Sequence, residues 1–152
     1  MKSANKPLLV CFIPVLCLIL NAPLWADSDP SGCSLDKGYL KPDNLFKNRL
    51  NIYDEKGSRV GTLKQDFLLK NRTYIYDNTG RRRGHLKEDP LLKNRTNIYN
   101  DNGENKGYLK QDWLFKDRTY IYDEKGDERG FLKKDPVFKD RTNIYLEPSE
   151  KE

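Results

Sequence analysis

Residues 61–83 read GTLKQDFLLKNRTYIYDNTGRRR, and close variants of this stretch fill the chain from Gly38 to its last residue. Each copy is 23 residues long, without insertion or deletion. The five copies cover residues 38–60, 61–83, 84–106, 107–129 and 130–152. A fixed period of this kind is typical of solenoids, propellers and hairpin arrays, so it predicts an architecture more sharply than an activity.

Each copy predicts two short strands joined by a seven-residue segment. In the second copy the strands are residues 61–64 and residues 73–76, the latter β-branched and aromatic. The intervening residues 66–72 begin with an Asp that is followed by Pro in two other copies, a pattern typical of a helix start. We therefore expect an all-β fold with one short helical or 3₁₀ turn in each repeat.

A hairpin turn is predicted at the end of the second strand, where four copies carry Asp or Asn three residues before Gly. This pattern favours a type I turn followed by a glycine bulge. Counting outward from the turn predicts that Ile75 and Arg83 share one face of the sheet, with Tyr74, Gly84 and Leu86 on the other.

Each repeat offers about five apolar side chains for burial. In the second copy they are Leu63, Leu68, Leu69, Ile75 and Tyr76. Burying them contributes about 1.5–3 kcal/mol each, whereas ordering each of the repeat's residues costs about 1.5 kcal/mol. One repeat therefore cannot fold alone, and we expect the units to depend on contacts with their neighbours.

The ends of the array leave one unpaired strand each, residues 39–41 and 142–145. These strands could pair and close a ring of hairpins. One observation argues against closure. The residue just before the Ile that every repeat carries alternates between Asn and Tyr along the chain, and five copies cannot alternate evenly round a ring. We therefore expect an open, twisted meander or solenoid, with the closed ring as the alternative.

The N-terminal residues have a different character from the repeats. Two lysines precede the apolar residues 8–20, and Ala26 offers a small residue for cleavage. This pattern predicts a secretory signal peptide at residues 1–26 and export to the periplasm, cell surface or exterior. Residues 27–37 are polar and predict a flexible linker. Its single cysteine, Cys33, is a candidate for an intermolecular bridge.

Catalytic and cofactor chemistry is not indicated by the sequence. His85 is the chain's single histidine and occupies a position that holds Tyr, Thr or Phe in the other copies, so we interpret it as a surface variant. No phosphate loop or cysteine pair is present in the sequence. The oxygen-rich residues 100–103 lack the spacing of a calcium loop. We therefore expect no enzymatic activity, no metal and no cofactor.

Regularly spaced cations and aromatic rings are the candidate binding residues. The formal charge of +5 permits weak attraction to anionic polymers. If the repeats stack, their Lys and Arg side chains would meet acidic groups while aromatic rings stack on sugar rings. A structural role, with Asp capping the turn and Arg lying over a Tyr face, is the alternative. The candidates are Lys64, Arg72, Tyr74, Lys87, Arg95, Tyr108, Lys110, Trp113, Arg118 and Tyr120.

The segment Tyr-Ile-Tyr-Asp-x-x-Gly-x-x-x-Gly-x-Leu-Lys, residues 74–87, resembles three families of tandem β-hairpins. Choline- and cell-wall-binding repeats share its aromatic residues and turn glycine. YD repeats share Tyr-Asp-x-x-Gly-Arg, as in residues 76–81, and MORN repeats share the 23-residue period. Each resemblance covers only the hairpin, and it implies an architecture without assigning functional residues.

The pattern as a whole predicts an exported binding module without enzymatic activity. The favoured ligand is an envelope glycan or a similar anionic polymer, because export makes a glycan a better candidate than nucleic acid, for which no specific binding is expected. The alternative is a structural or protein-interaction module that assembles through exposed strand edges or Cys33.

Overall fold

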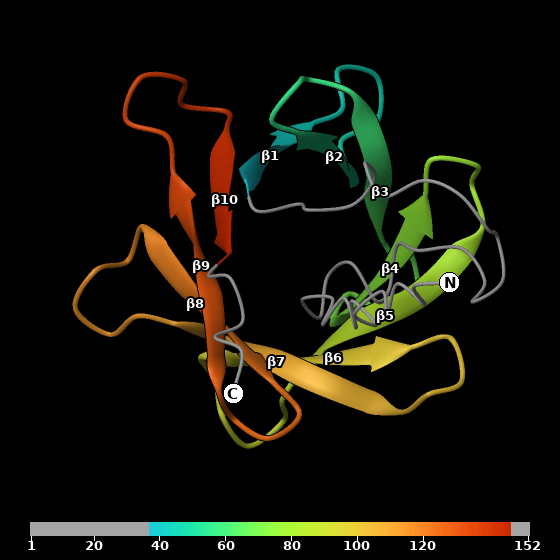
Figure 1. The fold of residues 1–152 in the computed structure, drawn as a ribbon. Coiled ribbons are helices and arrows are strands. Elements are labelled where there is room, and N and C mark those ends of the chain that lie inside the picture. Colours follow the sequence, from blue (N-terminus) through green and yellow to red (C-terminus); the bar gives the residue numbers. More distant parts are fainter. Residues whose placement is uncertain (1–36, 147–152) are drawn as a thin grey trace, which may run out of the picture.

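The computed structural model describes residues 37–146, which form ten antiparallel β-strands (Figure 1). The expected signal peptide, residues 27–36 of the expected linker and residues 147–152 lie outside the described residues. The strands are β1 (Lys37–Pro42), β2 (Arg49–Asp54), β3 (Arg59–Gln65), β4 (Arg72–Asp77), β5 (Arg82–Glu88), β6 (Arg95–Asn100), β7 (Asn105–Gln111), β8 (Arg118–Asp123), β9 (Glu128–Lys134) and β10 (Thr142–Leu146).

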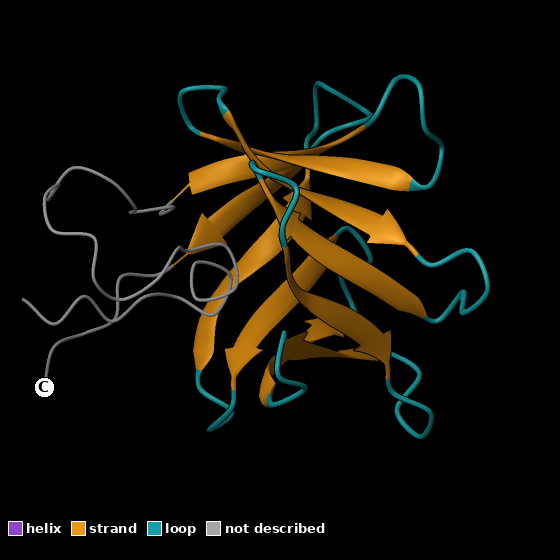
Figure 2. Ribbon diagram, turned by 90° about the vertical axis from the view of Figure 1, so that its right-hand side faces the viewer, coloured by secondary structure: helices purple, strands orange, loops and turns teal. Residues whose placement is uncertain are grey.

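The strands close into a barrel, so the expectation of an open meander is wrong and its alternative, a closed ring, holds. Each strand pairs with its sequence neighbours, and β1 pairs with β10 to complete the ring. The closing pair runs from Lys37, opposite Tyr145, to Leu40, opposite Thr142. Figure 2 shows the strands crossing the barrel obliquely, with the connecting loops at its ends. Closure supplies partners for both outer strands.

Closure is compatible with the Asn–Tyr alternation because only adjacent strands have to match. Asn97 faces Tyr108 within the array, and Asn143 faces Tyr39 at the closing pair. Both strand pairs also have the same cation–π contact. Arg95 lies 3.9 Å from the Tyr108 ring centroid, and Arg141 lies 3.8 Å from the Tyr39 ring centroid. The closing pair therefore repeats an internal interface.

Asn and Tyr alternate at these positions because both can donate a hydrogen bond to the same carboxylate. The Asn97 side-chain amide donates to Asp89 at 3.1 Å. In the neighbouring repeat the Tyr74 hydroxyl donates to Asp66 instead. Asn and Tyr can therefore fill the same role beside the Asp of the loop.

The long connections contain turns and no helix, contrary to the short helical turn that we expected. In the second repeat Asp66 Oδ1 accepts hydrogen bonds from the backbone N–H groups of Leu68, at 2.8 Å, and Leu69, at 3.0 Å. The Asp66 N–H donates to the Arg72 carbonyl at 2.9 Å and closes the loop. The Asp side chain thus satisfies backbone donors directly, as at a helix start, but in a non-helical turn.

The hairpin turns agree with the prediction. The four turn glycines have φ between 81° and 90°, the left-handed conformation that the bulge requires: Gly57, Gly80, Gly103 and Gly126. A second irregularity in each hairpin was not predicted. In the second hairpin the register shifts between Ile75 and Tyr76, so that Tyr76 lies opposite Arg82 while Ile75 lies opposite Gly84.

This second bulge makes the predicted face assignment wrong. Arg83 is the extra residue, and it places Ile75 and Gly84 on one face of the sheet. Tyr74 lies opposite His85 on the other face. One unpaired residue reverses the inward and outward positions along the rest of a strand.

The core is a ring of apolar side chains to which every strand contributes. Five fully or almost fully buried isoleucines come from the even-numbered strands: Ile52, Ile75, Ile98, Ile121 and Ile144. Each lies opposite a leucine of the preceding odd-numbered strand, of which Leu63 is buried and the rest pack against the cluster: Leu40, Leu63, Leu86, Leu109 and Leu132. Each pair belongs to one repeat, and the five pairs pack together in a single cluster. The dependence of a repeat on its neighbours stays a prediction.

Two apolar residues that we expected to be buried are exposed. Leu68 is 83% exposed and Leu69 is 47% exposed, because both lie in the loop between β3 and β4. The ring of ten inward residues fills the barrel from the strands, and the loop residues lie beyond the ends of those strands.

A prediction follows from the strand glycines. A methyl group on Gly107 would collide with the Tyr122 carbonyl oxygen, and its φ of +138° also disfavours a side chain. We expect Gly107→Ala to lower the free energy of unfolding by roughly 3 kcal/mol or more. Gly103→Ala, at a turn glycine with open space around it, should cost about 1 kcal/mol. Urea unfolding measures both, and equal losses would contradict the steric explanation.

A second prediction concerns Asp77. Burial alone would raise the pKa of this carboxyl group, but hydrogen bonds from Thr79, Arg81 and Arg83 outweigh it and lower the pKa from 3.8 to about 2. Because the folded pKa is the lower one, the carboxylate stabilises the fold above about pH 4, and this stabilisation is lost as the pH falls towards 2.

Asp77→Asn should therefore lower the unfolding free energy near neutral pH by roughly 2 kcal/mol and remove part of its dependence on acid pH. Asn100 holds the matching position in the next repeat, so the backbone tolerates the amide. Urea unfolding between pH 2 and 7 measures the effect, with Asp54→Asn as the matched control. An unchanged pH dependence would show that Asp77 is not the group responsible.

Candidate functional site

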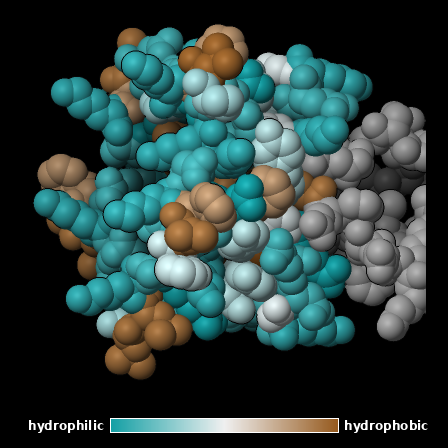
Figure 3. Space-filling model, turned by 90° about the vertical axis from the view of Figure 1, so that its left-hand side faces the viewer, coloured by the Kyte–Doolittle hydropathy of each residue, from teal (hydrophilic) through white to brown (hydrophobic). Residues whose placement is uncertain are grey.

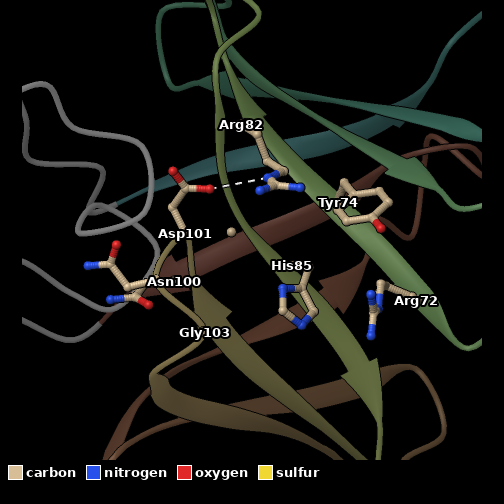
Figure 4. A pocket seen from close by; sticks show the side chains of 9 residues that line it. Arg72, Tyr74, Arg82, His85, Asn100, Asp101 and Gly103 are labelled. Atoms are coloured by element: carbon tan, nitrogen blue, oxygen red, sulfur yellow. Dashed lines mark hydrogen bonds and ion pairs between the residues drawn. The ribbon is translucent and has the colours of Figure 1, made fainter.

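The candidate site is a hollow on the outer surface of the barrel, with a cavity volume of about 260 Å³. Three segments that are separate in sequence form its walls (Figure 4). They are Arg72 and Tyr74 of β4, Arg82, Gly84 and His85 of β5, and residues 100–103 of the hairpin after β6.

Strand alternation positions the site's side chains. Tyr74 lies opposite His85, one residue away from the buried Ile75, so both face outward. His85 is fixed by two rings: it stacks on Tyr99 at a centroid distance of 5.0 Å and meets Tyr74 edge-on at 6.3 Å. The imidazole is therefore held in one orientation between two aromatic side chains.

Positive charge dominates the site. Arg82 is paired with Asp101 at 3.1 Å. Nε of Arg72 is buried and has no hydrogen-bond partner among the described residues. Burial lowers the pKa of His85, and the charges of Arg72, Arg82 and Lys87 lower it further. Since these cations repel a proton on the imidazole, the same field favours a negatively charged ligand.

Tyr39 and Tyr108 hold the position of His85 in their repeats, and both rings are covered by arginines. The faces of Tyr108 and Tyr39 carry the guanidinium groups of Arg95 and Arg141, at less than 4 Å from the ring centroids. At Tyr74 the nearest such contact is with Arg82, at 5.7 Å. Tyr120, which matches Tyr74 in its repeat, has Arg118 at a similar 5.9 Å, so both of these rings are less closely covered than Tyr39 and Tyr108.

The ten candidate binding residues predicted from the sequence lie in several different parts of the barrel. Arg72 and Tyr74 lie together in the hollow, while Arg95 is packed on Tyr108. Arg118 lies 5.9 Å from the Tyr120 ring centroid. The predicted lysines lie on odd-numbered strands beside these groups: Lys64 opposite Tyr74, Lys87 opposite Asn97, and Lys110 opposite Tyr120.

Trp113 is separate from the other nine. It lies in the loop between β7 and β8 and is 83% exposed. The ten residues therefore do not form one groove, and their role in binding stays a prediction.

Sequence reasoning missed Arg82, His85 and the hairpin residues Asn100 and Asp101. A signal was present, because residues 81–83 are three consecutive arginines and His85 follows two positions later, a combination found in this repeat alone. That the next hairpin forms a wall beside these residues could be learned only from the three-dimensional arrangement.

No family model matches the chain, and no curated protein matches it. A solved structure of a protein from Arabidopsis thaliana is similar with a TM-score of 0.48 and 13% sequence identity, covering 79% of this chain and 86% of that chain. A likeness of this size identifies neither a family nor a function.

Residues 37–146 contain no group of three or more His, Cys, Asp or Glu side chains placed to hold a metal ion. Within the same residues, no helix has the length and hydrophobicity needed to cross a membrane.

The electrostatics of the hollow predict the titration of His85. Its pKa should lie below the ordinary 6.5, and Arg72→Gln should raise it, because one repelling charge is removed. NMR can follow the titration without ambiguity, since the chain has one histidine. Lys56→Gln, in the first hairpin, is the control and should leave it unchanged. A wild-type pKa at or above 6.5 would contradict this description of the site.

Proposed function

We propose that the protein is an exported, non-enzymatic binding module for an anionic glycan of the cell envelope. The observation that carries the proposal is the cationic hollow, where Arg72, His85 and Tyr74 converge on the outer surface. In this proposal Arg72 holds a carboxylate or phosphate of the polymer, while Tyr74 contacts a sugar ring.

The Nε of Arg72 supports the choice of an anionic ligand, although the matching Nε atoms of Arg49 and Arg118 also lack a hydrogen-bond partner among the described residues. A buried polar atom without a partner is costly, and an acidic group that accepts its hydrogen bond removes that cost. The guanidinium group can bind two oxygens of a planar acid at once. Arg82 is already paired with Asp101, so it contributes to the field more than to direct contact.

The shape of the site supports a polymer over a small compact ligand. The hollow lies on the outside of the barrel, and the predicted lysines Lys64 and Lys87 lie on the strands that form and flank it. A chain with repeated acidic groups could follow these cations while one group occupies the hollow. Strong dependence on salt is expected for such contacts.

The alternative is a structural or protein-interaction module of the envelope. Its strand-edge version has less support, because all ten described strands are paired on both sides. Cys33, the other proposed means of assembly, lies outside the described residues.

The proposal can be tested with the full chain and polygalacturonate, a polymer of sugar acids, with neutral dextran as the control polymer. We expect binding to polygalacturonate at low salt, loss of binding by about half-molar salt, and no binding to dextran. Arg72→Gln should weaken binding about tenfold, as expected for the loss of one charge-assisted contact.

The control is Arg59→Gln, which removes one arginine charge from an exposed position in the first hairpin, outside the hollow. It should leave affinity within about twofold of wild type, since an exposed surface charge contributes little. Binding that is unaffected by Arg72→Gln, or equal affinity for dextran, would show that the hollow is not the binding site.

A further inference from the structure

The loops at one end of the barrel carry almost all of the exposed large hydrophobic side chains. In an antiparallel barrel built from consecutive strands, successive connections alternate between the two ends, so the five long loops share one end and the hairpin turns share the other. We call these loops the crown: residues 43–48, 66–71, 89–94, 112–117 and 135–140. Of the fourteen exposed large hydrophobic residues, twelve belong to the crown.

Each loop has a large apolar residue that is almost fully exposed. These residues are Leu45, Phe67, Leu91, Trp113 and Val137, and their exposed fractions run from 74% to 89%. Figure 3 shows brown hydrophobic side chains protruding from a surface that is otherwise largely hydrophilic. Exposed apolar groups repeated at one end of a protein are typical of an interaction surface.

Hydrogen bonds hold this exposure in place. Every crown loop has the same Asp turn and the same closing backbone bond, for example Asp112 accepting from Leu114 at 2.8 Å and donating to the Arg118 carbonyl at 3.0 Å. The loops therefore have a fixed shape that presents their apolar residues instead of folding them back onto the barrel.

The net charge of the described residues is concentrated at the same end. The crown loops with their flanking residues, 41–49, 64–72, 87–95, 110–118 and 133–141, contain sixteen Lys or Arg and eight Asp or Glu, a net charge of +8. The remaining described residues contain nine of each and are neutral. A lysine follows the apolar residues in every loop: Lys47, Lys70, Lys93, Lys116 and Lys139.

We infer that the crown docks onto a bilayer of anionic phospholipids. Apolar tips, each followed in the sequence by a lysine, match a bilayer surface, where hydrocarbon lies beneath negatively charged headgroups. Trp113 in a tip position suits the interface between the two, where Trp is favoured. The tips are distributed around the end of a ring, which fits a broad, flat surface better than a single pocket on a protein partner.

The apolar tips of the crown are separate from the hollow of the candidate site, although Arg72 lines the hollow and directly follows the crown loop at residues 66–71. Arg82 lies at the hairpin end of β5, and the tips lie beyond the opposite ends of the strands. The tryptophan and lysine variants below leave Arg72 unchanged, so failure of glycan binding and failure of this inference can be told apart.

Fluorescence of Trp113 in the full chain tests the inference directly. Trp25→Phe removes the other tryptophan. With vesicles of equal parts phosphatidylglycerol and phosphatidylcholine, Trp113 emission should shift to the blue, and lipids brominated in their acyl chains should quench it. Vesicles of phosphatidylcholine alone should produce neither effect, since they lack the negative charge.

A relocated tryptophan controls for the orientation of the protein. In the chain with Trp25→Phe, Trp113→Leu and Lys125→Trp, the reporter lies in a hairpin of the same repeat at the other end of the barrel. It should remain unquenched. Residues 8–20 are the same in every variant, so any membrane affinity of that apolar stretch does not affect the comparison.

Matched charge variants test the role of the lysines. Lys47→Gln, Lys70→Gln and Lys93→Gln together should reduce the vesicle affinity detected through Trp113 by on the order of tenfold to a hundredfold. Lys56→Gln, Lys106→Gln and Lys125→Gln together remove the same charge from the hairpin end and should change it less than about twofold. Circular dichroism verifies that both variants are folded.

Several outcomes would overturn the inference. They are the absence of blue shift and quenching with anionic vesicles at low salt, quenching of the relocated tryptophan in place of Trp113, and equal losses from the two lysine sets. Self-association through the crown in the absence of lipid, detected by sedimentation, would also overturn it, because the surface would then serve a second copy of the chain.

Discussion

The structure depends on one ring of apolar side chains inside the barrel, formed by an isoleucine or leucine from each of the ten strands. No repeat can complete this ring alone, because its isoleucine and leucine need neighbours on both sides. The barrel is therefore a cooperative unit although its sequence is a row of near-identical parts. Closure between β1 and β10 gives the terminal repeats the same surroundings as the inner ones.

Much of this fold could be predicted from the sequence, and the failures have specific causes. The hairpin turns were predicted because Asp and Gly report directly on local backbone geometry. The face assignment failed at Arg83, since a second bulge depends on the register of the strand pair and leaves no local signature. The open array was favoured because alternation was counted over the whole chain, whereas contacts such as that of Asn143 with Tyr39 require only adjacent strands to match.

The candidate site shows a different limit. Arg72 and Tyr74 were identified because they recur. His85 was not, because it departs from the repeat, and Arg82 was not, because its position varies between Arg, Asn, Glu and Lys. In a repetitive sequence the residues that recur are the easiest to identify, and many of them have structural roles. Arg95, for example, covers the ring of Tyr108 in the barrel wall. Individual function in such a protein is better sought where one copy differs, and where a neighbouring hairpin such as residues 100–103 adds a further wall.

The likeness between the closing pair and the internal interfaces has a consequence for the chain's connectivity. Lys37 and Tyr145 lie opposite each other at the closing pair, so a short linker could join the two ends of the barrel. Opening the chain instead at residues 78–79 would yield a circular permutant with the same ten strands in the same spatial order. Such a permutant would keep every strand pair of the ring while moving the chain ends to a different hairpin.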